Sequence, residues 1–158
     1  MNQSPKRKPV LIMIAMVIAI FFSCSTTKIA QDDLEKLKNL QPPPEKALVY
    51  LARPGTLGGL ITFDITCDDQ NIGSLPAKRF IYVMLDSGAH RFVGVAEKNS
   101  ELLLRVEPGK IYYIEERAKM GIMSARNELT ILTPEDGQQA LKKCKLSGNC
   151  PAYQQSSK

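Results

Sequence analysis

Few residues in this chain of 158 have side chains that commonly do catalytic chemistry: there is one histidine and there are four cysteines. The histidine, His90, lies in a stretch of alternating apolar residues, and no sequence typical of serine or cysteine hydrolases accompanies it. The favoured interpretation is a strand histidine that is hydrogen-bonded locally. No pair of carboxylates has the pattern of a general acid and base. The sequence therefore predicts a protein that is not an enzyme, with no catalytic residues.

A metal site is not predicted either. Zinc would require His90 together with Cys67, Cys144 and Cys150. Structural zinc sites usually contain a local C-x₂₋₄-C pair, whereas the closest spacing here is C-x₅-C. The sequence also contains no motif that binds a cofactor, so we expect no metal and no cofactor.

The two C-terminal cysteines, Cys144 and Cys150, are predicted to form a disulfide. Five residues separate them, and the Ser-Gly-Asn sequence between them can reverse the chain. Disulfides form in oxidising compartments outside the cytoplasm, which the N-terminus described below indicates. The alternative is two free thiols near a loosely held C-terminus. Cys67 is expected to stay free, because it shares the apolar face of its strand.

One surface candidate lies between two predicted strands. Met120, Ile122 and Met123 are apolar, and the basic Arg126 follows them closely. Such a segment can contact a partner protein or lipid headgroups. The alternative interpretation is that its apolar side chains cover the open end of the core, as apolar loop residues more often do.

The N-terminus has the organisation of an export signal. Three basic residues at positions 6–8 precede an apolar run of 13 residues, Val10 to Phe22. A membrane-spanning helix needs about 20 apolar residues, so residues 1–23 are predicted to be a signal peptide. The order of basic residues, apolar residues and Ser23-Cys24 resembles the lipobox of bacterial lipoproteins. That resemblance implies a diacylglycerol on the thiol of Cys24 and cleavage before it. The alternative is an uncleaved signal anchor in which Cys24 is incidental.

Cleavage of the signal would change the charge of the protein. The formal net charge of the whole chain is +5, from 21 basic and 16 acidic residues. Residues 1–23 contain three basic residues and no acidic residue, so the remaining chain has 18 minus 16, or +2. A nucleic-acid partner is therefore not expected, because nucleic-acid binding depends on a dense positive surface.

Beyond the signal, three segments are predicted: a lipidated tether at 24–46, a folded domain at 47–146 and a C-terminal tail at 147–158. Leucines at positions 34, 37 and 40 have the spacing of one or two helical turns. A solvated tether is favoured over a helix there, because isolated helices this short are only marginally stable. The prolines Pro42–Pro44 stiffen its end.

The folded domain is predicted to be all-β. Apolar residues alternate with polar ones most clearly from Leu60 to Cys67, which is the pattern of a half-buried strand. Seven or eight such strands predict an antiparallel β-sandwich of immunoglobulin-like or transthyretin-like type. One C-terminal helix is expected after Thr133, which suits the N-cap, with Pro134 at the first helical position. The predicted strands are Ala47–Arg53, Leu60–Cys67, Ile72–Leu75, Arg79–Leu85, Ala89–Glu97, Glu101–Glu107, Lys110–Arg117 and Glu128–Leu132.

Several short motifs occur in a defined order between Ala47 and Lys145. They are Ala47–Pro54, Ile72–Leu75, Gly88–His90, Pro108–Tyr113 and Met120–Gly121. In this order, behind a lipobox-like signal, they resemble a family of bacterial lipoproteins known as domain of unknown function 2846. The resemblance implies a lipid-anchored β domain in the cell envelope, and it implies no catalytic residues.

These patterns predict a lipid-anchored protein of the bacterial cell envelope with a non-catalytic domain for binding or scaffolding. It would contact the membrane through its N-terminal lipid and bind an envelope protein or a cell-wall component. Ser25 follows Cys24, which in lipoproteins of enteric type implies sorting to the outer membrane, with the domain facing the periplasm. Two alternatives stay open: an envelope enzyme with an unrecognised site, and a single-pass inner-membrane protein that displays the same domain.

Overall fold

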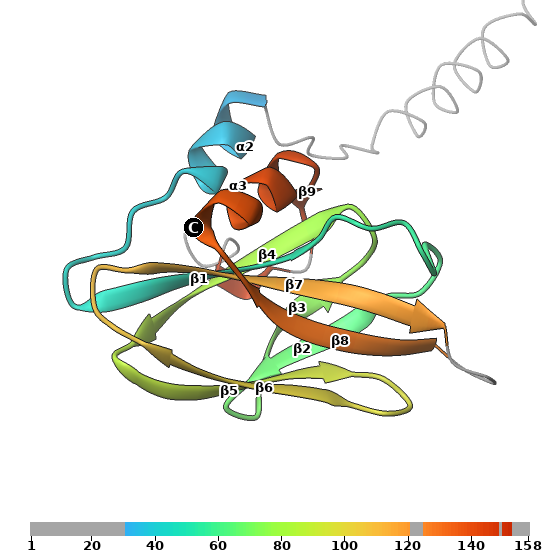
Figure 1. Cartoon of the computed structure of the whole chain (residues 1–158). Coiled ribbons are helices and arrows are strands. Elements are labelled where there is room, and N and C mark those ends of the chain that lie inside the picture. Colours follow the sequence, from blue (N-terminus) through green and yellow to red (C-terminus); the bar gives the residue numbers. More distant parts are fainter. Residues whose placement is uncertain (1–30, 121–124, 149, 153–158) are drawn as a thin grey trace, which may run out of the picture. The chain divides into compact units, whose positions relative to one another are not determined.

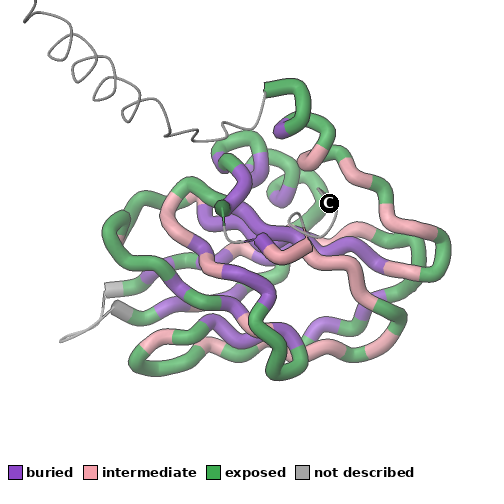
Figure 2. Tube along the Cα trace, turned by 180° about the vertical axis from the view of Figure 1, so that it is seen from behind, coloured by how far each residue is buried: buried purple, intermediate pink, exposed green. Residues whose placement is uncertain are grey.

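The computed structural model describes residues 31–120, 125–148 and 150–152 (Figure 1). This part of the chain is mostly β, with a five-stranded mixed sheet, a four-stranded antiparallel sheet and two short helices. The two sheets form layers, and both helices lie on the side of the mixed sheet that faces away from the antiparallel sheet (Figure 1). Buried residues follow the strands between these layers (Figure 2). No helix among the described residues is long and apolar enough to span a membrane.

The mixed sheet is built around one almost fully buried strand. In β1 (Lys46–Arg53), every residue after Lys46 is buried, which is typical of a strand covered on both faces. β1 pairs antiparallel with β4 (Arg79–Asp86) and parallel with β7 (Ile111–Met120). The sheet is completed by β8 (Ala125–Leu132) beside β7 and by β9 (Lys145–Leu146) beside β4.

The second sheet confirms the alternation seen in the sequence. In β2 (Phe63–Cys67), Phe63, Ile65 and Cys67 are buried, while Asp64 is exposed. The predicted start of this strand at Leu60 was wrong, because residues 60–62 lie before the strand. The remaining strands of the sheet, whose order is β3-β2-β5-β6, are β3 (Gln70–Leu75), β5 (Gly88–Val95) and β6 (Ser100–Val106).

The prediction of antiparallel sheets was wrong for the larger sheet. β1 and β7 run parallel, and so do β4 and β9. Alternation of apolar and polar residues reports which face of a strand is buried. It does not report which strand lies alongside or in which direction that strand runs. The two-residue β9 was too short to give any periodic signal.

The C-terminal helix has the predicted start. α3 (Pro134–Lys142) begins after the N-cap Thr133, whose side chain accepts a hydrogen bond from the Asp136 backbone N–H at 3.2 Å. Gly137 lies directly against the ring of Tyr113 on β7, and a Cβ atom there would clash with that ring. A glycine is therefore required for this close packing of helix on sheet, despite its low helix propensity.

The segment that we expected to be a solvated tether forms a second helix on the domain. α2 (Gln31–Lys38) buries Leu34, and the Tyr50 hydroxyl ties the end of this segment to β1. That hydroxyl donates to the Leu37 carbonyl at 2.8 Å and accepts from the Leu40 N–H at 3.2 Å. Tertiary packing stabilises a helix that would be marginal alone.

Candidate functional site

The two sheets are joined along one side and open along the other. On the joined side β8 lies over β6, and the Leu129 N–H donates to the Ser100 hydroxyl at 3.0 Å. On the other side the outer edges of β3 and β4 face each other. They are bridged at one end by Ser147, whose N–H donates to the Phe80 carbonyl and whose hydroxyl donates to the Ser74 carbonyl. An opening is therefore left between β3 and the rest of β4.

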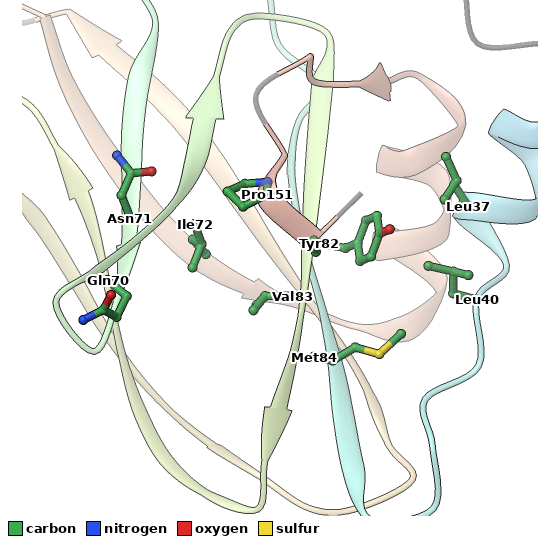
Figure 3. Close-up of a pocket in the computed structure, with 10 residues that line it drawn as sticks. Leu37, Leu40, Gln70, Asn71, Ile72, Tyr82, Val83, Met84 and Pro151 are labelled. Atoms are coloured by element: carbon green, nitrogen blue, oxygen red, sulfur yellow. The ribbon is translucent and has the colours of Figure 1, made fainter. Parts of the chain in front are cut away.

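This opening is an apolar groove of about 540 Å³ (Figure 3). Its volume lies within the range of small-ligand sites, which is about 300–1,000 Å³. None of its lining residues is charged, and the only side-chain amides are those of Gln70 and Asn71, both exposed. The apolar lining residues are Leu37, Leu40, Ile72, Tyr82, Val83, Met84, Pro151 and Ala152.

The groove wraps around the outer edge of β4. β4 pairs with β1 over its whole length, but on its other side it pairs with β9 only at Arg79 and Phe80. Beyond Phe80, the chain after β9 continues along this edge, and Cys150 Sγ lies 3.7 Å from the Tyr82 carbonyl. Tyr82 and Met84 point toward the leucines near α2, and Val83 points the opposite way, toward β3 (Figure 3). The groove thus presents apolar surface on both faces of a strand edge.

A second cavity of about 370 Å³ lies over a buried ion pair. Arg53 is 1% exposed and Glu116 is 0% exposed, and the Arg53 Nε lies 3.2 Å from Glu116 Oε2. The rest of the guanidinium donates to backbone carbonyls at 2.7–3.3 Å. These carbonyls belong to Leu57, Gly58, Ile61 and Leu75. Arg53 therefore holds the loop before β2 against the end of β3.

Glu116 is the least satisfied polar group of this cavity. Neither carboxylate oxygen has a hydrogen-bond donor among the described residues. Burial raises the pKa of Glu116 from its ordinary 4.5 to about 7, and the nearby Arg53 charge offsets only part of this rise. The carboxyl group therefore gains and loses its proton near neutral pH, unlike a surface glutamate.

A third cluster lies at the turn between β2 and β3. Asp68 and Asp69 form this turn with positive φ angles of 48° and 65°, which aspartate tolerates better than most residues. His90, on β5, is hydrogen-bonded to residues outside its own strand, one of them 22 residues away, and not locally as the sequence predicted. Its Nδ1 lies 2.6 Å from Asp68 Oδ2, and its Nε2 lies 2.9 Å from the Asp86 carbonyl. Asp68 Oδ1 also accepts the Arg91 backbone N–H at 2.9 Å.

The cluster includes the buried thiol of Cys67. Donor atoms of Cys67, Asp68 and His90 all lie within 4.8 Å of one another. Burial, followed by the Asp68 carboxylate, raises the pKa of the Cys67 thiol to about 12. Burial lowers the pKa of His90, but its hydrogen bonds to Asp68 and Asp86 outweigh that effect and raise the pKa overall. A thiol this hard to deprotonate is not an activated nucleophile.

The predicted disulfide between Cys144 and Cys150 is not present, and both residues are buried free thiols. The chain does not reverse between them but continues along β4. The Lys145 N–H donates to the Lys78 carbonyl, whereas Cys150 Sγ lies 3.7 Å from the Tyr82 carbonyl. The Lys78 and Tyr82 carbonyls are four residues apart, which is about 13 Å along a strand. Cysteines joined by a disulfide have Cα atoms within about 7 Å of each other. The two thiols are thus held apart, and the start of the C-terminal tail is packed rather than loose.

The other predicted site residues lie mostly outside the described residues. These include Cys24, with the whole signal, and Ile122 and Met123 of the surface candidate. Met120 ends β7 opposite Ala125, and Arg126 is an exposed residue of β8. The proposed contact surface at this end of the domain therefore stays a prediction.

Sequence reasoning missed the groove and the buried ion pair. A signal for the ion pair existed: adjacent side chains of a strand point to opposite faces, so either Glu115 or Glu116 had to face the interior. Arg53, at the end of an apolar strand, was the matching cation. No comparable signal existed for the groove, because its residues come from four separate segments.

Comparison with known proteins shows which family this chain belongs to. A family model described as protein of unknown function (DUF2846) matches residues 43–128, which is more than half of the chain. A protein of Haemophilus influenzae, described as an uncharacterized protein, is 26% identical over 134 residues, which cover 83% of this chain and 80% of that protein. No solved structure matches the chain. The matched region runs from the residues just before β1 into β8, and the chain accordingly belongs to the DUF2846 family.

Proposed function

We propose that this protein is lipid-anchored in the bacterial cell envelope and that its β domain is a non-catalytic binding module. The anchor is supported by the basic, apolar and small residues that precede Cys24. The binding role is supported by the open apolar groove between β3 and β4. The two sheets form a sandwich of immunoglobulin-like or transthyretin-like type, the membrane is contacted through the lipid, and the domain faces the periplasm from the outer membrane.

The occupant of the groove is an extended apolar segment of another envelope protein, bound beside Val83 and Met84 of β4. A peptide strand places its side chains alternately on two sides, and the groove offers apolar surface on both sides of the β4 edge. The segment after β9 covers the outer edge of β4 at Phe80 and Tyr82, so the proposed occupant lies beyond Tyr82, beside Met84. The amides of Gln70 and Asn71 can bond to the peptide backbone at the mouth of the groove. An uncharged lining favours an uncharged segment.

Replacing Met84 with glutamate should weaken peptide binding at least about tenfold, because the new carboxylate would be desolvated by the bound segment. The measurement is fluorescence anisotropy of the full-length protein in detergent, with a labelled ten-residue peptide of alternating valine and threonine. The same composition in block order is the peptide control. Leu103→Glu is the matched protein control, because Leu103 is 72% exposed on β6, at the far edge of the antiparallel sheet.

If the Met84→Glu and Leu103→Glu variants lose the same amount of peptide affinity, the peptide does not bind in this groove. A fluorescent fatty acid is titrated in parallel. If it binds and the alternating peptide does not, the groove accepts acyl chains rather than protein. A variant that ends at Ala152 tests whether the residues after this position compete with the peptide for the groove. If they do, this variant binds the peptide more tightly than the full chain does.

Replacing Cys24 with alanine should abolish lipid attachment and leave an uncleaved precursor, because the thiol is the acceptor of the diacylglycerol. Metabolic labelling with an alkyne fatty acid, followed by gel fluorescence, measures this. Cys150→Ala is the matched control and should retain the label. Equal labelling of the Cys24→Ala variant and the parent chain would instead favour the single-pass anchor.

A further inference from the structure

We propose that Cys67, Asp68 and His90 together bind a zinc ion at the turn between β2 and β3. The three residues supply one thiolate, one carboxylate and one imidazole, which are the three ligand types that zinc accepts in proteins. Their donor atoms already lie within 4.8 Å of one another. Spacing along the chain did not predict this site, because it contains no local C-x₂₋₄-C pair and its third ligand is a carboxylate.

The tertiary structure brings the third ligand into place. Asp68 follows Cys67 directly, and the tight turn turns its carboxylate toward His90, 22 residues further along the chain. β2 and β5 are neighbours in the sheet, with Cys67 opposite Phe92. Two rigid strands and one two-residue turn thus hold the three donors, and ligands on rigid elements bind metal with little ordering cost.

Partners outside the cluster orient two of the ligands as in known zinc sites. A zinc-binding histidine usually gives its second ring N–H to a carbonyl or carboxylate, and a zinc-binding carboxylate is usually itself hydrogen-bonded. His90 Nε2 lies 2.9 Å from the Asp86 carbonyl, which leaves Nδ1 to face the metal. Asp68 Oδ1 accepts the Arg91 N–H, which leaves Oδ2. These contacts are independent of the proximity of the three donors.

Binding requires only a small local change. His90 Nδ1 and Asp68 Oδ2 are 2.6 Å apart, and they would separate to about 3.3 Å around a tetrahedral ion with ligand distances of about 2.0 Å. The exposed Asp68 side chain can make this movement. The ion replaces the thiol proton and the proton between His90 and Asp68, and both protons pass to the buffer. A water molecule takes the fourth position, on the solvent side.

The test uses Co²⁺ as a spectroscopic probe, followed by Zn²⁺ competition, on the full-length protein in detergent with its metal removed and its thiols reduced. We expect one Co²⁺ per chain, a near-ultraviolet thiolate-to-cobalt charge-transfer band, and visible bands with tetrahedral intensity, all displaced by Zn²⁺. The Cys67→Ala variant should lose the charge-transfer band. The Asp68→Asn variant should bind zinc at least about tenfold more weakly, while asparagine still suits the positive φ.

Matched variants separate this site from general metal binding. Asp69→Asn changes the other residue of the same turn, and Cys144→Ala combined with Cys150→Ala removes the other described thiols; both should bind as the parent does. The proposal is overturned if the parent chain binds no stoichiometric Co²⁺, if the band persists in Cys67→Ala, or if Asp68→Asn and Asp69→Asn weaken binding equally. If Cys67→Ala does not fold, His90→Gln takes its place. The proposal predicts that this variant loses Zn²⁺ affinity, and unchanged affinity would overturn it.

Discussion

Replacing Arg53 with methionine is expected to lower the free energy of unfolding by about 3–5 kcal/mol, which is the usual effect of removing one partner of a buried ion pair. The methionine keeps much of the apolar stem, and so most of its packing, in the space where the guanidinium carbon lies 4.8 Å from the centre of the Phe63 ring. What is lost is the charge beside Glu116 and the donors to four backbone carbonyls. The bond to the Leu75 carbonyl is buried, and a buried carbonyl left without a donor is costly.

Urea denaturation of both chains, followed by far-ultraviolet circular dichroism, measures this loss. Arg79→Met is the matched control, because Arg79 pairs with Arg53 across β1 and β4 but is exposed, with one long hydrogen bond of 3.3 Å to Leu146. It should lose less than about 1 kcal/mol. A similarly small loss in Arg53→Met would mean that Arg53 is not the residue that holds the loop before β2.

The free energy of unfolding is also expected to fall by about 3 kcal/mol as the pH rises from about 4.5 to about 7, because Glu116 must lose its proton while buried. Its pKa is higher in the folded chain than in the unfolded chain, so the folded state binds the extra proton within this window. The stabilisation by protonated Glu116 is complete below pH 4.5 and is lost by about pH 7. A difference of 2.5 pKa units corresponds to about 3 kcal/mol.

The same denaturation series, repeated in Glu116→Gln, isolates this contribution from other titrating groups. The amide cannot ionise, so the difference in stability between parent and variant should change with pH by about 3 kcal/mol. Glu115→Gln is the control, because Glu115 is adjacent but lies in a salt bridge with Arg117. A pH-independent difference between the parent and Glu116→Gln would show that Glu116 stays ionised in the folded protein.

The experiments on Arg53 and on Glu116 both test the buried ion pair beside the second cavity. Arg53 and Glu116 lie at the end of β1 and in β7, two strands paired in parallel in the mixed sheet. Their ion pair therefore joins two strands whose parallel pairing the sequence did not predict. A buried pair of this kind can help to specify the register of a sheet as well as its stability, and the double variant of both residues would measure the coupling between them.

Local sequence patterns predicted most of the elements correctly. Strand alternation between Leu60 and Cys67 predicted a half-buried strand, and Phe63 and Ile65 are buried there while Asp64 is exposed. The Thr133-Pro134 pair marked the start of α3 to the residue. These features depend on the periodicity of one strand or on the capping of one helix, and both are properties of a few consecutive residues.

By itself, therefore, the sequence determined the approximate positions of eight of the strands, the start of the C-terminal helix and the buried face of β2. Only the tertiary structure decided that β1 and β7 are parallel, that α2 packs on the domain, and that Cys144 and Cys150 are held apart. It alone brought Asp68 to His90 and opened the groove beside Met84. The reason is physical: each of these features depends on which distant segments lie side by side, and side-chain periodicity within one segment carries no information about its neighbour.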